Sequence, residues 1–131
     1  MKIVLIAHDS KKNLMQNLCI AYRGILVRHE LYATGTTGRM IEEVTNLSIH
    51  KYLAGHLGGI QQARSQIVNN DADLVIFLCD PMTPKSHEPN LMEILKACDI
   101  YNIPFATNPA TAEALIMALD RGDLDWREIY H

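Results

Sequence analysis

Short apolar runs that alternate with stretches of helical periodicity constrain the fold of this chain more than any other feature. The clearest runs are Lys-Ile-Val-Leu-Ile-Ala at 2–7 and Leu-Val-Ile-Phe-Leu-Cys at 74–79. Continuous runs of this length are typical of strands that are buried on both faces of a sheet. Weaker segments of the same kind predict shorter strands at 30–33, 49–54 and 103–106.

Helices are predicted between these strands. Leu14, Leu18, Ala21 and Ile25 recur at helical spacing, which indicates a helix over residues 11–28. The pattern predicts further helices at 39–45, 60–69, 91–101 and 112–119. Because strands and helices alternate throughout, we expect an α/β fold with a mainly parallel, five-stranded sheet and helices on both of its faces.

Composition narrows the class of protein. A length of 131 residues with 48% apolar content suits one domain over 1–131. The net charge of -3 without a basic stripe argues against nucleic-acid binding, and the run at 2–7 is too short for a membrane span. Cys19, Cys79 and Cys98 form no Cys-x-x-Cys pair, so we expect buried free thiols and a cytoplasmic location. The histidines show no metal-ligand spacing, so no metal is expected.

Unusual polar and glycine residues follow each predicted strand. In an open parallel sheet, ligands bind outside the carboxyl ends of the strands. We therefore expect one ligand site at one edge of the sheet, where these segments meet: His8-Asp9, 34–38, 55–59, Asp80 and Thr107-Asn108.

The segment Thr34-Gly35-Thr36-Thr37-Gly38 indicates a phosphate site. It follows a strand and precedes a helix, where free N–H groups favour an anion and glycine lets the backbone approach a ligand. Lys12 or Lys11 is the predicted countercharge. The alternative is a tight turn capped by threonine. The glycines at 55–59 are a weaker candidate for a second backbone cradle.

Two histidines are candidates for the chemistry. His8 ends a strand beside Asp9, and His87 lies in a proline-rich segment. Each is predicted to polarise a carbonyl group or donate a proton, and the alternative for each is an ordinary surface histidine.

Several motifs together resemble the methylglyoxal synthase family. They agree in order and spacing along nearly the whole chain: Ala-His-Asp at 7–9 with Lys12, Tyr-Ala-Thr-Gly-Thr-Thr-Gly at 32–38, Gly-x-Leu-Gly-Gly-x-Gln-Gln at 55–62, Asp80-Pro81, His87-x-Pro89, and Ile-Pro-x-Ala-Thr-Asn at 103–108. The resemblance implies a Rossmann-like (flavodoxin-like) three-layer fold, usually a homohexamer, and a lyase that needs no metal or cofactor.

The resemblance also implies a reaction and roles for residues. The family converts dihydroxyacetone phosphate to methylglyoxal and inorganic phosphate, by removing a proton next to the carbonyl group and then expelling phosphate. His8 and His87 would contact substrate oxygens, with Asp9 and Asp80 nearby. The residues implied to bind phosphate are Lys12, Thr34, Gly35, Thr36, Thr37 and Gly55.

The chain departs from the family at the position of the catalytic base. The family motif is Ser-Gly-Pro-Leu/Met-Gly-Gly-Asp-Gln-Gln, and this chain has Ala-Gly-His-Leu-Gly-Gly-Ile-Gln-Gln at 54–62. Ile60 therefore replaces the aspartate that serves as the catalytic base, and His56 replaces the proline. Asn90 replaces a second carboxylate, and Lys96 stands where arginine is usual. Losing a general base commonly costs roughly 10²–10⁴-fold in rate.

Three functions are compatible with these departures. The chain is a methylglyoxal synthase whose base is His56, Asp9 or Asp80; or a lyase for another small phosphorylated substrate; or a catalytically silent homologue that binds a phosphorylated metabolite and regulates a process through assembly. The retained threonine segment, His8, His87 and Asp80 favour the first.

Overall fold

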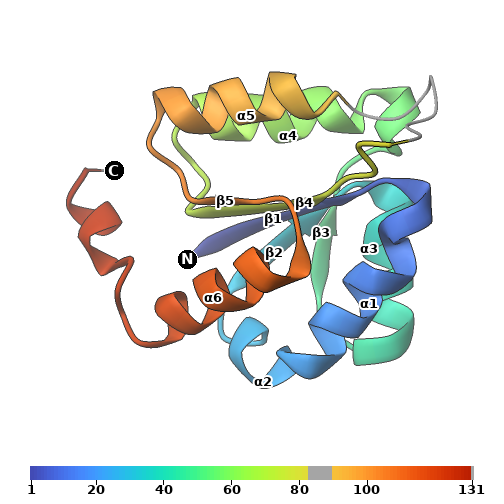
Figure 1. The fold of residues 1–131 in the computed structure, drawn as a ribbon, viewed down its shortest axis with the longest axis horizontal. Coiled ribbons are helices and arrows are strands. Elements are labelled where there is room, and N and C mark those ends of the chain that lie inside the picture. The colour runs from blue at the N-terminus through green and yellow to red at the C-terminus, as the bar shows by residue number, and fades with distance from the viewer. Residues whose placement is uncertain (83–89, 131) are drawn as a thin grey trace.

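The computed structural model describes residues 1–82 and 90–130 and forms three layers, with a parallel sheet between two layers of helices (Figure 1). The five strands lie in the order β3-β2-β1-β4-β5, and all of the paired strands are parallel. The strands are β1 (Lys2–Ala7), β2 (Glu30–Ala33), β3 (Ile49–Lys51), β4 (Leu74–Leu78) and β5 (Phe105–Ala106). The predicted α/β class with a mainly parallel five-stranded sheet is therefore confirmed.

Five α-helices of the described residues connect these strands, and a sixth follows β5. They are α1 (Lys12–Ala21), α2 (Arg23–Leu26), α3 (Gly35–Thr45), α4 (Gly59–Val68), α5 (Leu91–Ile100) and α6 (Pro109–Asp120). In Figure 1, α4 and α5 cover one face of the sheet, and α1, α2, α3 and α6 cover the other.

The apolar residues of β1 and β4 fill both layers of the core. Ile3 and Leu5 of β1 pack with α1, α3 and α6, whereas Val4 and Ile6 pack with α4 and α5. Successive side chains of a strand point to opposite faces, so a strand buried on both sides must be apolar at every position. This is why the runs at 2–7 and 74–79 were the strongest strand signals.

Several predicted boundaries are wrong, each for a local reason. The predicted helix at 11–28 is two helices, because the backbone of Tyr22 leaves helical angles (φ -110°, ψ 21°) between α1 and α2. The predicted strand at 103–106 is only Phe105–Ala106, since Pro104 has no N–H group to donate to a neighbouring strand. The predicted strand at 49–54 ends at Lys51, and the chain then turns toward α4.

The starts of α3 and α6 were also misplaced. α3 begins at Gly35, so the glycine-threonine segment that was expected to precede this helix forms its first turn. α6 begins at Pro109 rather than at 112, because the Asn108 side chain accepts a hydrogen bond from the Thr111 N–H group and proline suits the first helical position.

A buried arginine fixes the C-terminal segment against the residues that precede β4 and β5. Arg127 is only 3% exposed and pairs with Asp73, with 3.4 Å between Nε and Oδ1. Its Nη1 donates to the carbonyl oxygen of Asn102 at 2.6 Å, and its Nη2 donates to that of Ala72 at 3.0 Å. The segment is therefore held by polar contacts within the chain, although Trp126 beside it is 40% exposed.

The three cysteines are free and buried, as predicted. Burial raises the pKa of Cys19 and of Cys98 to about 12, so both stay protonated at physiological pH. Within residues 1–82 and 90–130, no helix has the length and apolar character that crossing a membrane requires.

A close approach of two backbones joins the end of β3 to the start of α4. A Cβ atom on Gly59 would lie 1.9 Å from the carbonyl oxygen of Leu53, closer than atoms can approach. The Gly59 N–H group donates to the carbonyl oxygen of Ala54 at 3.1 Å. Only glycine leaves room for this contact, which sets the path of residues 53–59.

We expect Gly59→Ala to lower the free energy of unfolding by about 1–3 kcal/mol, the usual cost of overpacking, because the backbone of Leu53 must move. The matched control is Gly24→Ala in α2, where a Cβ atom meets nothing within 4 Å. That change should stabilise the protein by roughly 0.5–1 kcal/mol. Urea denaturation of both variants measures the difference, and equal midpoints would contradict the steric argument.

Candidate functional site

His8 and Asp80 meet where β1 and β4 end. The His8 N–H group donates to the carbonyl oxygen of Leu78 at 3.0 Å, and the Asp80 N–H group donates to His8 Nδ1 at 2.8 Å. The ring is 3% exposed and packs edge-on against Phe77, with centroids 5.4 Å apart. Because Nδ1 accepts a hydrogen bond, the neutral ring carries its proton on Nε2 and presents a donor there.

Two donors among the described residues contact the carboxylate of Asp80. Its Oδ2 accepts from Ser10 Oγ at 3.0 Å, and its Oδ1 accepts from the Met82 N–H group at 3.0 Å. Sequence reasoning missed Ser10. Its position two residues after His8 was the available signal, because that spacing places it at the same end of β1.

Lys12 lies beside Asp9 at the start of α1. Its Nζ is 3.1 Å from Asp9 Oδ1 and donates to the carbonyl oxygen of Ala7 at 3.1 Å. The ammonium group is thus held close to the carboxyl end of β1, where the sequence predicted a countercharge. Lys11, the alternative countercharge, lines a cavity that Lys12 does not line.

The predicted phosphate segment is the N-terminal turn of α3. The amides of Thr36 and Thr37 have no acceptor within the helix, because they precede its first complete turn, and the helix dipole favours an anion there. The helix has no acidic residue in this turn. Thr36 is exposed, whereas Thr34 and Thr37 are nearly buried and share a hydrogen bond of 3.4 Å between their hydroxyl groups.

The residues that lead into the second predicted phosphate-binding segment, at 55–59, contact the first. The Gly35 N–H group donates to the carbonyl oxygen of Leu53 at 3.2 Å, and a Cβ atom on Gly35 would lie 3.0 Å from the carbonyl oxygen of Tyr52. Gly55 begins the short turn η2 (Gly55–Leu57), directly after this contact. The structure therefore places Gly55 close to the start of α3. The backbone of His56 lies in η2, and its side chain is outside the described part.

Arg39 is a second cation that sequence reasoning missed. Its Nη1 lies 3.4 Å from the position that a Cβ atom on Gly35 would occupy. The signal was its spacing, because a residue four positions after Gly35 lies on the same side of α3. Arg39 therefore adds positive charge beside the N-terminal turn of that helix.

The two positions that replace family carboxylates have structural roles. Ile60 is 6% exposed and packs into the core beneath α4 and α5, with Val4, Ile6 and Phe77 among its cluster. The Asn90 side chain caps α5 by accepting from the Met92 N–H group at 2.9 Å. Lys96 is exposed on α5.

Not every predicted site residue is placed. His87 lies outside the described residues, so its expected position beside His8 stays a prediction. The described residues form two groups at one edge of the sheet, one of His8, Asp9, Lys12 and Asp80 and one of residues 34–37 with Gly55. In the described part of the chain, no group of three or more His, Cys, Asp or Glu side chains is arranged to hold a metal ion.

Comparisons with known proteins agree on one family. Residues 16–107 match the model of the MGS-like domain. The chain is 60% identical to the methylglyoxal synthase of Caldicellulosiruptor saccharolyticus over 129 residues, which cover 98% of this chain and 92% of that protein. It is 56% identical to the methylglyoxal synthase of Alkaliphilus metalliredigens, with 98% and 96% covered. The crystal structure of methylglyoxal synthase from Elizabethkingia anophelis superposes with a TM-score of 0.85 at 37% identity, covering 88% of this chain and 76% of that one.

Inorganic phosphate should stabilise the protein, because the start of α3 and Lys12 offer donors and charge to an anion. Phosphate at a concentration of tenfold its dissociation constant raises the free energy of unfolding by about 1.4 kcal/mol, which raises Tm by roughly 3–6 °C. Thermal melts in phosphate and in chloride of equal ionic strength measure this shift. Lys12→Met and Thr36→Val should reduce it, whereas Thr111→Val, at the start of α6, should not. A shift that is unchanged in all three variants would contradict the assignment.

His8 should remain the Nε2–H tautomer in its neutral form, because the Asp80 N–H group occupies Nδ1. Long-range ¹H–¹⁵N spectra report which ring nitrogen carries the proton. The exposed His50 is the internal comparison, and we expect it to average between the two tautomers. Similar averaging at His8 would mean that the hydrogen bond from Asp80 does not persist in solution.

Proposed function

The chain belongs to the family of MGS-like domains, and from that premise we propose that it is a carbon–oxygen lyase of the methylglyoxal synthase type, with weak or altered chemistry. The substrate is dihydroxyacetone phosphate, and the products are methylglyoxal and inorganic phosphate. The observation that carries the proposal is the arrangement at one sheet edge: an anion-binding helix start and, at the ends of β1 and β4, a histidine with a fixed tautomer.

Phosphate binding accounts for the first part of the reaction. The amides of Thr36 and Thr37, the hydroxyl of Thr36 and the ammonium group of Lys12 hold the phosphate, with Gly55 beside them. Thr34 and Gly35 set the backbone from which these groups project. Arg39 adds charge at the same helix end. Holding the substrate by its phosphate group places the carbonyl carbon at a fixed distance from the ends of β1 and β4.

The next step is the loss of a proton from the carbon that bears the free hydroxyl group. The electron pair left behind forms the double bond of an enediolate, and Nε2–H of His8 stabilises the developing negative charge on the former carbonyl oxygen. His87 contributes to the same task. As inorganic phosphate leaves the neighbouring carbon, the hydroxyl group of the enediolate loses its proton and becomes the aldehyde. The enolate that remains takes up a proton on its terminal carbon and gives methylglyoxal.

Proton removal is the weak step in this chain. Ile60 has no group that accepts a proton, and its side chain belongs to the core. The remaining candidates are Asp80, Asp9 and His56. Asp80 accepts hydrogen bonds from Ser10 and Met82, and Asp9 pairs with Lys12. Each carboxylate would have to give up one of these interactions in order to accept a proton from the substrate. We therefore expect the rate to be low.

The proposal extends to the assembly and the location of the enzyme. The chain acts as one MGS-like domain, in a homohexamer, in the cytoplasm. The surface offers apolar groups for such contacts, since Ile100 and Leu57 are 75% and 64% exposed.

A second candidate function is favoured by the burial of Ile60. A catalytically silent homologue would bind a phosphorylated metabolite at the start of α3 and regulate a process through assembly. Such a protein gains stability from the apolar side chain of Ile60 in the core, and it does not need a catalytic base. A lyase for another small phosphorylated substrate remains the third possibility.

Ile60→Asp should raise lyase activity by roughly 10²-fold or more, because it supplies a general base. The new carboxyl group replaces a side chain that is 6% exposed, so burial will raise its pKa toward the range of an effective base and will also lower stability. The measurement is release of inorganic phosphate from dihydroxyacetone phosphate by wild type and variant. The matched control is Ile60→Asn, because the side chain of asparagine has nearly the shape of aspartate but no carboxylate.

The same assay separates the candidate functions. A wild-type rate of about 10 s⁻¹ or more, typical of metabolic enzymes, would show that the chemistry is intact. Asp9→Asn, Asp80→Asn and His56→Ala would then identify the substitute base. If neither wild type nor Ile60→Asp releases phosphate while phosphate still binds, the silent homologue takes the place of the lyase.

A further inference from the structure

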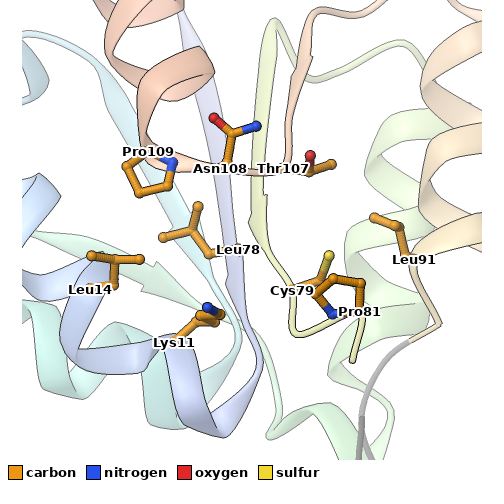
Figure 2. A pocket seen from close by; sticks show the side chains of 9 residues that line it. All are labelled: Lys11, Leu14, Leu78, Cys79, Pro81, Leu91, Thr107, Asn108 and Pro109. Carbon is orange, nitrogen blue, oxygen red and sulfur yellow. The ribbon is translucent and has the colours of Figure 1, made fainter. Parts of the chain in front are cut away.

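A cavity of about 380 Å³ lies at the carboxyl ends of β4 and β5, beside the candidate site (Figure 2). Its walls come from the starts of α1, α5 and α6 and from the residues that follow β4 and β5. None of the residues assigned above to phosphate binding or catalysis lines it. Lys11 and Pro81 line it, and they are next in sequence to Lys12 and Asp80, so the cavity adjoins the candidate site without sharing its residues.

The charge of the lining favours an anion. Among the lining side chains that the structure describes, Lys11 is the single charged one and none is a carboxylate. Cys79 contributes no competing negative charge, because burial raises the pKa of its thiol more than the Lys11 ammonium lowers it. Against these described side chains, a cationic ligand would meet repulsion from Lys11 and no carboxylate.

Two further side chains offer hydrogen bonds, and one of them has a fixed orientation. The Asn108 Oδ1 accepts from the Thr111 N–H group at 3.0 Å, so its amide nitrogen is the end left for donation. Figure 2 shows that nitrogen on the side toward Thr107, whose hydroxyl lies at the same end of the cavity. The cavity thus has hydrogen-bond donors at the end formed by Thr107 and Asn108 and a cation on the opposite wall.

The rest of the lining is apolar. It consists of side chains from Leu14, Leu78, Pro81, Leu91 and Pro109. One cation with two hydrogen-bonding side chains balances a single negative charge, whereas a phosphate dianion would keep an uncompensated charge against these walls. The lining suits a ligand that combines one carboxylate with a short hydrocarbon part.

We propose that this cavity is a second binding site and that it takes a small aliphatic monocarboxylate. The carboxylate lies between Lys11 and the donors of Thr107 and Asn108, and the hydrocarbon part contacts Leu14, Leu78 and Pro109. Binding here does not depend on the proposed lyase activity, because the two sites use different side chains.

The test is a titration of the full chain with sodium butyrate, followed by ¹H–¹⁵N spectra. The amides of Lys11, Cys79 and Thr107 should shift in a saturable way at millimolar butyrate, while those of Thr36 and Thr37 stay in place. Butylammonium chloride should cause no saturable shift at Thr107. Inorganic phosphate should shift Thr36 and Thr37 instead. Absence of a saturable butyrate shift, or equal shifts with butylammonium, overturns the proposal.

Two variants test the location. Lys11→Met keeps the aliphatic stem and removes the charge, and it should weaken butyrate binding about fivefold, the value of a partly exposed ion pair. Lys96→Met, on the exposed face of α5 outside this cavity, is the matched control and should bind like wild type. Leu14→Trp fills the cavity from a half-exposed position and should abolish binding while the fold persists. Butyrate binding that survives both Lys11→Met and Leu14→Trp unchanged places the ligand elsewhere and refutes the site.

Discussion

The parallel direction of all five strands is the constraint on which the rest of the structure depends. Helices cover both faces of the sheet, so the central strands β1 and β4 are buried and apolar from Ile3 to Ala7 and from Leu74 to Leu78, and they leave no room there for polar groups. The polar residues of these central strands therefore lie at their ends, and parallel direction brings the segments that leave the strands to one edge of the sheet. His8, Thr34, Asp80 and Thr107 come from four different strands and share that edge for this reason.

Close backbone contacts then give that edge its shape. Gly59 lies against the carbonyl group of Leu53, and the Gly35 N–H group donates to the same carbonyl oxygen. Because both helices start against the same residue, the N-terminal turn of α3 and the turn η2 are held together. A phosphate bound at α3 would meet donors whose positions are set by the backbone, which costs less ordering than donors on long side chains.

The edge contains two arrangements with different chemistry. Around the start of α3, cations and amides suit a compact anion with high charge. In the cavity at the carboxyl ends of β4 and β5, one lysine and two hydrogen-bonding side chains lie among apolar walls. Between them, Asp80 and His8 link the ends of β4 and β1 through the bond from N–H to Nδ1. Ile60, at the position that the resemblance assigns to the catalytic base, belongs to the apolar core.

Sequence by itself determined the order of strands and helices, the edge at which the polar segments meet, and the family, because apolar periodicity and glycine-threonine motifs depend on neighbours along the chain. It also identified Lys12 and the threonine segment as candidates for phosphate binding. It could not show that the threonine segment is helical, since a glycine-rich stretch has weak helix propensity until packing against Leu53 fixes it. Only the tertiary structure joined Ser10 to Asp80, Arg127 to Asp73 and Arg39 to Gly35, and only it enclosed the cavity beside Lys11. Each of these depends on residues brought together from separate turns or distant segments, and no local pattern records such a distance.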